Sequence, residues 1–288
     1  MKISSSILTI LFLLRVQVSL AGGGWPQEKG HGYFKVSQWW LVSHQHFTDV
    51  GLIDPNVTNK LFNTSFYGEY GITPRLTGII YAPFYSRALF NSIVSGTTGE
   101  VLVPGEAINS FGDTDISLKY GLTPKKSVAL SATLTLGLPL GNDRGGSQGN
   151  LQTGDGEFNQ LLQIDMGKSY KLLGQNAYAN VYAGFNNRTS GFSDEFRFGV
   201  ETGVQLFDNR LIALVRVYGV KSLKNGSLAD AITSTSVFAN NSEHITVSPE
   251  VAWKFGKNWG VSATAGGAVY GRIIFASPAY SAGVFLTI

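Results

Sequence analysis

The sequence predicts an all-β protein: a transmembrane antiparallel up-and-down β-barrel of about twelve strands, with ten or fourteen strands as alternatives. Three observations predict it. Apolar and small polar residues alternate along most of the chain, and the connections between the alternating segments are short and long in turn. No run of about 18 apolar residues, the length that a membrane-crossing helix needs, follows the N-terminal region.

The N-terminus predicts a signal peptide over residues 1–21, followed by a barrel domain over residues 22–288. Lys2 supplies a positive start, an apolar run extends from Ile7 to Leu14, and Ser19-Leu20-Ala21 offers small residues for cleavage. The alternative is an N-terminal anchor that stays in place, but the apolar run is too short to cross a bilayer as a helix. We therefore expect an exported protein.

The composition narrows the class of protein further. The chain has no cysteine, so it has no disulfide framework. Removing Lys2 and Arg15 from the 22 basic residues leaves 20 against 19 acidic residues, which gives no basic surface for nucleic acid. No ATP site or other cofactor motif is present. We expect no cofactor and no nucleic-acid partner.

Twelve alternating segments can be drawn, many of them close to the roughly ten residues that a tilted strand needs to cross a bilayer. In order they are 32–44, 61–72, 76–87, 115–122, 127–141, 157–170, 177–187, 195–206, 211–222, 243–255, 260–272 and 279–288. Short connections such as 73–75 and 207–210 alternate with longer ones such as 88–114 and 223–242. One rim should therefore carry short periplasmic turns, and the other should carry the long outer loops.

Residues 127–141 illustrate the alternation. Leu130 and Leu134 fall on one parity, and Ser131 and Thr133 fall on the other. Because successive side chains of a strand point to opposite faces, we expect the leucines to face lipid and the hydroxyls to face a hydrated lumen. A soluble sandwich with a leucine-lined core is the alternative.

Two segments break the pattern, because apolar side chains fall on the face assigned inward. These are Trp39 and Leu41 in the first segment, and Ile212 and Leu214 in the ninth. Three explanations stay open: a register shift, a bulge or a locally apolar lumen.

The C-terminal segment sets Tyr280, Val284 and Ile288 on one face and ends there. It resembles the last strand of outer-membrane barrels, which the barrel-assembly machinery reads, although such strands usually end in Phe. Aromatic residues near the segment ends predict two interfacial girdles. We expect outer-membrane lipid and the assembly machinery as partners, and the bacterial outer membrane as the location.

Charged side chains on the inward parity are the candidate lumen or pore residues. They are Lys35, Glu69, Asp115, Lys119, Asp165, Arg197, Glu201, Arg216, Glu250, Lys254 and Arg272. Unpaired charges are costly in a narrow barrel, so we expect Glu201 to pair with Arg216 and Glu250 with Arg272. The charges either hold a closed polar core or line a path for a solute. Since both signs are interspersed, no strong ion selectivity is predicted.

An enzyme is a weaker alternative, because outer-membrane phospholipases have barrels of similar size. Ser43 or Ser242 could meet His44 or His244 at the outer rim, but no nucleophile motif accompanies them. His44, His46 and Asp49 have weakly specific metal-ligand spacing. We predict neither an enzyme nor a metal site.

Two stretches, residues 111–142 and 151–185, resemble the bacterial outer-membrane family labelled meta-pathway of phenol degradation, also described as a transporter family. The matching features are G-D-x-D at 112–115, L-P-x-G at 138–141 and T-G-x-G at 153–156. Leu140 and Asn142 depart from the common Thr and Asp. The resemblance implies an outer-membrane barrel that passes small hydrophobic or aromatic compounds, and it supplies no catalytic residues.

The predicted function is passive transport of small solutes. An apolar solute would use a patch near the outer mouth and then the polar lumen or a lateral opening. The patch comprises Tyr33, Trp39, Leu41, Tyr81 and Tyr85. The competing hypothesis is a structural or surface-interaction barrel with a closed lumen, whose loops 88–114 and 223–242 bind partners.

Overall fold

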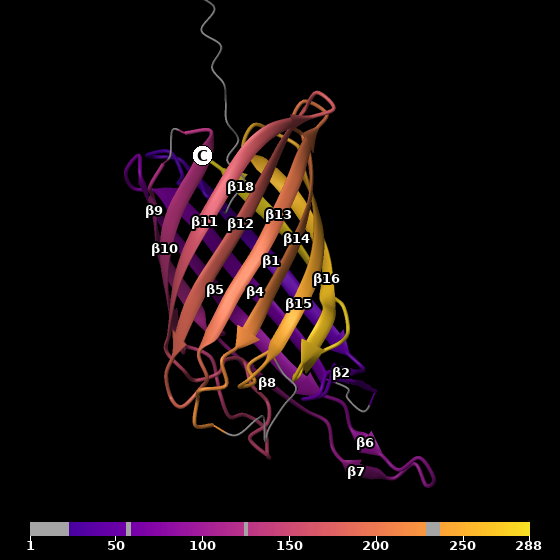
Figure 1. Ribbon diagram of the computed structural model, residues 1–288. Helices are drawn as coiled ribbons and strands as arrows, with labels where there is room; N and C mark the ends of the chain where they lie inside the picture. The colour runs from indigo at the N-terminus through magenta and orange to yellow at the C-terminus, as the bar shows by residue number, and fades with distance from the viewer. Residues whose placement is uncertain (1–22, 56–58, 124–125, 229–236) are drawn as a thin grey trace, which may run out of the picture.

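Twelve antiparallel strands close into a barrel in the computed structural model, which describes residues 23–55, 59–123, 126–228 and 237–288 (Figure 1). Each strand pairs with the next, and β1 pairs with both β4 and β18, which closes the ring. The barrel strands are β1 (Gly32–Ser43), β4 (Asn59–Gly71), β5 (Leu76–Phe90), β9 (Thr114–Gly121), β10 (Val128–Leu138), β11 (Asn159–Leu172), β12 (Gln175–Arg188), β13 (Glu195–Leu206), β14 (Leu211–Ser222), β15 (Glu243–Lys254), β16 (Trp259–Arg272) and β18 (Ala279–Thr287). The predicted fold class and all twelve predicted segments are confirmed.

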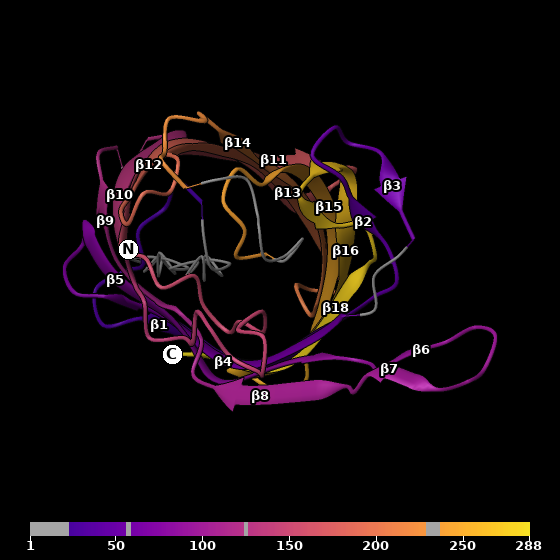
Figure 2. The same ribbon diagram turned by 90° about the horizontal axis from the view of Figure 1, so that it is seen from below.

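The long connections gather at one end of the barrel, called the loop end below, and the short ones at the other, called the turn end (Figure 1). At the loop end, β8 (Glu106–Ser110) extends the wall by pairing with the end of β5. The hairpin of β6 (Ile93–Val94) and β7 (Val101–Val103) projects away from the ring (Figure 2).

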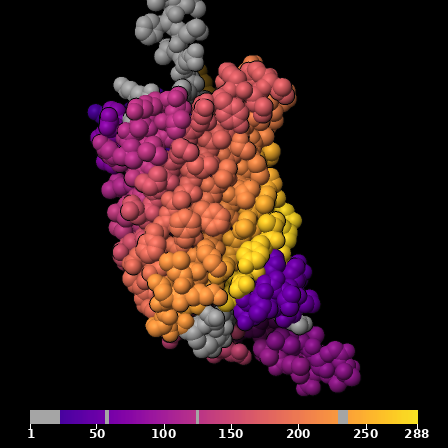
Figure 3. Space-filling view, viewed as in Figure 1, coloured from indigo at the N-terminus to yellow at the C-terminus, as the bar shows by residue number. Residues whose placement is uncertain are grey.

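A small sheet of β2 (His46–Phe47), β3 (Ile53–Asp54) and β17 (Ile274–Phe275) also lies at the loop end. In Figure 3 the indigo residues that precede β4 lie beside the projecting hairpin. The sequence predicted none of these short strands, because each of them lies in a segment assigned to a loop. None of the described residues belongs to a helix that could cross a membrane.

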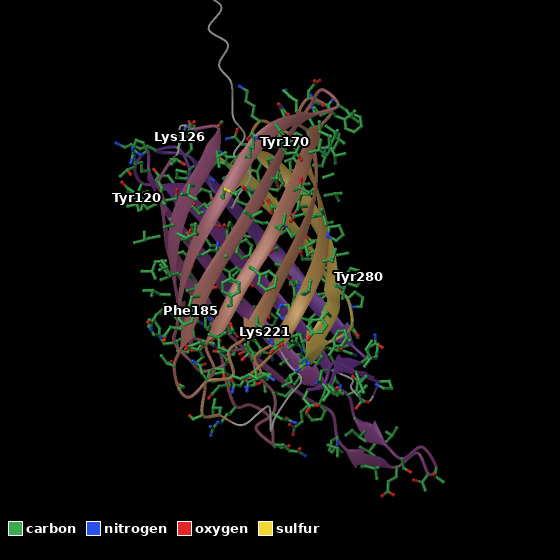
Figure 4. The ribbon with its side chains drawn as sticks, in the orientation of Figure 1. Tyr120, Lys126, Tyr170, Phe185, Lys221 and Tyr280 are labelled. Atoms are coloured by element: carbon green, nitrogen blue, oxygen red, sulfur yellow. The ribbon has the colours of Figure 1, made fainter. Side chains whose placement is uncertain are left out.

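The predicted alternation of faces is present along the barrel wall. On β10 the outward Leu134 is 45% exposed, whereas the inward Ser131 is fully buried. The outward Val284 and Ile288 near the C-terminus are also exposed. Figure 4 shows the aromatic side chains Tyr120 and Tyr170 toward the turn end, with Phe185 and Tyr280 nearer the loop end. The outer wall is therefore an apolar band flanked by aromatic residues, as a bilayer requires.

The two breaks in the pattern are explained by a locally apolar lumen. Leu41 lies in an inward cluster that we call the loop-end cluster, and Ile212 and Leu214 lie in a second one, the turn-end cluster. The loop-end cluster consists of Leu41, Leu61, Ala88, Leu151 and Phe275, with Trp39 packed against it. The turn-end cluster consists of Ile212, Leu214, Ala252 and Phe285, with Tyr33 packed against it. No register shift is needed at either place.

Two β-bulges do change the parity, and each corrects a predicted site residue. In β5, Phe84 is the extra residue opposite the step from Thr64 to Ser65, so Tyr85 turns outward. In β16, Val269 is the extra residue, so Tyr270 faces outward and Arg272 leaves the lumen face. The predicted inward positions of Tyr85 and Arg272 are wrong for this reason, because a single extra residue inverts the alternation.

Residues 23–27 lie inside the ring at the turn end (Figure 2), and residues 28–31 are exposed at its rim. Lys119 Nζ donates a hydrogen bond to the Gly23 carbonyl at 2.9 Å, and Trp25 contacts the ring of Tyr178 edge-on at 6.5 Å. Gln27 donates to Glu69 Oε2 at 2.9 Å. The segment thus fills part of the lumen that the sequence analysis left open to water. The predicted signal peptide lies outside the described residues.

Candidate functional site

A cavity of about 390 Å³ lies inside the barrel. Trp39 of β1, and Tyr81 and Pro83 of β5, supply apolar and aromatic surface. Polar surface comes from hydroxyl, amide and carboxylate groups. The complete lining is Ser37, Trp39, Asn63, Ser65, Tyr81, Pro83, Asp113, Thr153, Val237, Phe238 and Ser281. A site of this size and mixture suits a small molecule with an apolar body and a polar group.

Four of the predicted lumen charges meet in one network, which we call the charged belt: Lys35, Glu201, Arg216 and Glu250. Arg216 pairs with Glu201, as predicted, and its Nη1 lies 2.5 Å from Glu250 Oε2. Lys35 Nζ lies 3.1 Å from Glu250 Oε1. The predicted pair of Glu250 and Arg272 does not form, because the register places Glu250 opposite Thr264 and Arg272 opposite Glu243, seven residues away along β15.

Tyrosine side chains surround the charged belt. Tyr178 donates a hydrogen bond to Glu201 Oε1 at 2.8 Å. Tyr67 donates to Glu69, which also accepts from Gln27 of the N-terminal segment. Tyr33 stacks on Phe285 of the turn-end cluster. At this level the lumen is therefore narrowed by hydrogen-bonded side chains.

Four other predicted lumen residues lie apart from the belt. Asp165 accepts hydrogen bonds from Thr133 and Gln163. Arg197 pairs with Glu195 at 2.7 Å. Lys119 holds the N-terminal segment, as described above, and Lys254 lies at the turn end of β15. Of the predicted apolar patch, Trp39 and Tyr81 share the cavity, Leu41 belongs to the loop-end cluster, and Tyr33 belongs to the turn end.

A second buried network, centred on Arg188, was missed by the sequence analysis. Its guanidinium group contacts Asp155 at 2.9 Å, Glu157 at 2.6 Å and Glu195 at 2.8 Å, and its side chain is only 4% exposed. It also lies over the Phe192 ring, at 4.3 Å from the ring centroid. This network fixes Asp155 and Glu157, in the connection between β10 and β11, to β12 and β13.

Asp113 connects the three sequence motifs that carry the family resemblance. Its carboxylate accepts hydrogen bonds from the Gly141 amide at 2.9 Å and from the Asp155 amide at 2.8 Å, so it joins G-D-x-D to the other two motifs. Burial raises the pKa of Asp113. Burial also raises the pKa of Asp155 to about 6, against the opposing effect of Arg188. These motifs therefore shape the loop end, next to the cavity.

Gly154→Ala is expected to lower the free energy of unfolding by about 1–3 kcal/mol, because the added methyl group would collide with the Asp113 carboxylate. Urea unfolding in lipid vesicles, followed by tryptophan fluorescence, measures this change. Gly96→Ala is the matched control, since no atom lies within 4 Å of a methyl group there. Equal stability of the two variants would contradict this role for Asp113.

The histidines form no catalytic arrangement in the described part of the chain. Ser43 donates its hydroxyl hydrogen to the Gln45 carbonyl, and the His244 ring packs edge-on against Tyr218. No hydrogen bond joins a serine hydroxyl to a histidine ring among the described residues, and no group of metal-ligating side chains occurs there. The hydrolase alternative gains no support from this arrangement.

Comparison with known proteins gives similarity at the level of the fold. No protein-family model matches the chain, and no curated protein matches it. The chain is similar to the COG4313 outer membrane channel from Pseudomonas putida F1, with 12% identity, 94% of this chain and 100% of that chain covered, and a TM-score of 0.62. It is also similar to the NanC porin, with 7% identity, coverage of 88% and 100%, and a TM-score of 0.50. The fold is that of a bacterial outer-membrane β-barrel.

Proposed function

We propose that the protein is exported by a signal peptide over residues 1–21 and acts as a passive outer-membrane channel for small apolar or aromatic solutes. The cavity inside the barrel is the observation that carries this proposal. It offers the faces of Trp39 and Tyr81 to an apolar body and the Ser37 and Asn63 side chains to a polar group. Its volume lies in the range of small-molecule sites.

The position of the cavity supports the same function. Trp39 lines the cavity and also packs against the loop-end cluster, so an apolar solute that enters from this end meets apolar surface first. The charged belt and the N-terminal segment lie toward the turn end and narrow the rest of the path. Such a path favours small solutes over large hydrophilic ones.

Trp39→Ala is expected to weaken solute binding in the cavity about tenfold, since an aromatic contact contributes roughly 0.5–1.5 kcal/mol beyond its buried area. The probe is 4-nitrophenol, added to the purified full-length barrel in a planar bilayer, where binding interrupts the single-channel current. The dependence of the interruptions on probe concentration gives the affinity.

Trp40→Ala is the matched control, because Trp40 neighbours Trp39 on β1 but faces outward against Tyr280. We expect wild-type interruptions from this variant. Equal losses in the two variants would contradict the cavity as the binding site. A complete lack of current steps, together with a lack of solute uptake in liposome swelling, would contradict the channel itself.

A closed barrel that binds partners through its loops is the second candidate. The charged belt and the N-terminal segment favour it, because both fill the lumen. The β6–β7 hairpin also favours it, since Ile93, Val94, Val101 and Leu102 are all more than half exposed. The conductance experiment separates the two candidates, because only a channel gives current steps.

A further inference from the structure

The outer wall at the loop end carries a group of side chains that solute passage does not use. We call it the basic–aromatic patch: Lys60 of β4, Phe84, Tyr85 and Arg87 of β5, and Asn109 of β8. Phe84 and Tyr85 are exposed on this wall. The patch combines two cationic side chains with aromatic surface on the face that meets the membrane.

The β5 bulge creates the patch. Without the extra residue Phe84, Tyr85 and Arg87 would share the inward face with Tyr81 and Pro83. With it, Ser86 and Ala88 take the buried inward positions, and Tyr85 and Arg87 point outward. Bulges commonly redirect a side chain in this way at functional positions.

Neutral groups orient the Arg87 side chain. Arg87 Nη1 donates a hydrogen bond to Asn109 Oδ1 at 2.8 Å, and the Tyr85 hydroxyl donates to the same oxygen at 3.0 Å. Within the described ranges, no carboxylate lies at ion-pair distance from Arg87 or Lys60. In the described part of the chain, these two positive charges on the outer wall therefore have no acidic partner.

The strand register places these charges beside outward aromatic side chains near the loop end of the wall. Arg87 is paired with Phe62, Phe62 with Trp40, and Trp40 with Tyr280, which forms an outward row across four strands. Such aromatic rows mark the membrane interface. Lys60 lies one outward position nearer the loop end than Phe62, which places its ammonium group beyond the row.

The opposite wall has the same arrangement, but there the charge is neutralised. Phe185 is paired with Phe196, and Phe196 with Lys221, in a corresponding row. Lys221 Nζ, however, lies 2.7 Å from Glu243 Oε2. Figure 4 shows Phe185 and Lys221 toward the loop end of this wall. The Lys221 charge on this wall is thus paired with a carboxylate, unlike those of Arg87 and Lys60 among the described residues.

We propose that the basic–aromatic patch binds a phosphate group of an outer-leaflet glycolipid of the lipid A type. The guanidinium fork of Arg87 matches the geometry of a phosphate, and Lys60 adds a second cation. Phe84 and Tyr85 contact the apolar part of the same lipid below the headgroup. This inference depends on the placement in the outer membrane with the loop end outward, and it does not depend on solute passage.

The test measures binding of diphosphorylated lipid A to the full-length barrel in detergent by native mass spectrometry. The Lys60→Gln/Arg87→Gln double variant should bind about thirtyfold more weakly, because each basic side chain near an anionic lipid surface contributes roughly a factor of five. Lys221→Gln is the matched control and should bind as the wild type does. Resistance of each folded barrel to detergent without heating verifies that the variants fold.

Two further probes identify the source of the phosphate. Lipid A without its phosphates should bind the wild type as weakly as diphosphorylated lipid A binds the double variant, and inorganic phosphate should not displace lipid A. Undiminished binding by the double variant, or an equal loss in Lys221→Gln, would overturn the proposal. Displacement by inorganic phosphate would overturn the lipid as the ligand. Solute-induced current interruptions should be the same in the double variant and the wild type.

Discussion

Arg188→Met is expected to lower the free energy of unfolding by about 3–5 kcal/mol, because removal of one partner from a buried ionic network leaves uncompensated charge. Asp155, Glu157 and Glu195 all contact this single guanidinium group, at 2.6–2.9 Å. Methionine keeps much of the side-chain volume, so the loss reports the charge and the hydrogen bonds more than the packing.

The measurement is urea unfolding of the full-length barrel in lipid vesicles. Arg144→Met is the control, because the Arg144 side chain is 85% exposed and makes a long contact, with 3.9 Å between its Nε and Asp143 Oδ2. An exposed pair of this kind contributes about 0–1 kcal/mol. If both variants lost the same small amount, the Arg188 network would not hold the loop end.

The stability loss in Arg188→Met should shrink as the pH falls from about 7.5 to about 5. Burial raises the pKa of Asp155 to about 6 in the folded protein, so the folded state holds this proton more tightly than the unfolded state does. The stabilisation from protonation is thus present at low pH and is lost as the pH rises through about 6. Arg188 opposes this rise in the pKa of Asp155, so protonation stabilises the folded variant without Arg188 more than it stabilises the folded wild type. A loss that did not depend on pH would point to packing instead.

The strands could be predicted because the alternation of apolar and polar residues lies within the sequence of each strand. In β10, a period of two over Val128–Leu138 fixes which side chains meet lipid, and the burial of Ser131 beside the exposure of Leu134 follows from it. The same holds for β18. Hydrocarbon outside the barrel and a confined interior act on every strand in the same way, so twelve segments could be drawn without knowing their partners.

The bulges were not predictable in this way. A bulge adds one residue to one strand, and its signature is only a mismatch between two strands far apart in sequence. The side chains of Tyr85 and Arg272 therefore lie on the face opposite to the predicted one. The predicted Glu250–Arg272 pair fails for a different reason, because the register places Arg272 opposite Glu243 and not near Glu250. The pair of Glu201 and Arg216 lies on adjacent strands with an undisturbed register, and it was predicted correctly.

The loop-end network and the N-terminal segment depend on long-range contacts. Arg188 gathers carboxylates from residues 31 and 33 positions earlier, and no periodic pattern indicates that convergence. Gln27 reaches Glu69, 42 residues away. Only the motifs at 112–115 and 153–156 indicated part of this arrangement. They contain Asp113 and the Asp155 amide to which its carboxylate is hydrogen-bonded.

Arg216→Gln is expected to convert the charged belt into a cation-selective constriction. In the belt, Lys35 and Arg216 balance Glu201 and Glu250, so the loss of one cation leaves a net charge of −1. The Coulomb energy between a unit charge and an ion about 4 Å away is about 4 kcal/mol at an effective dielectric constant of about 20. This energy is enough to shift the cation-to-anion preference at least about tenfold. The shorter side chain also breaks the bridge between β13 and β15, so the single-channel conductance should rise.

Reversal potentials in a salt gradient across a planar bilayer measure the preference separately from the conductance. The Glu201→Gln/Arg216→Gln double variant is the matched control: it restores neutrality, because Lys35 still balances Glu250, but it leaves the bridge broken. Its conductance should stay high while its selectivity returns to that of the wild type. If the single variant showed wild-type conductance and no cation preference, ions would not pass through the belt, and the lumen would have to be closed elsewhere or bypassed by a lateral route. The paired design thus separates what the charges do from what the bulk of the arginine side chain does.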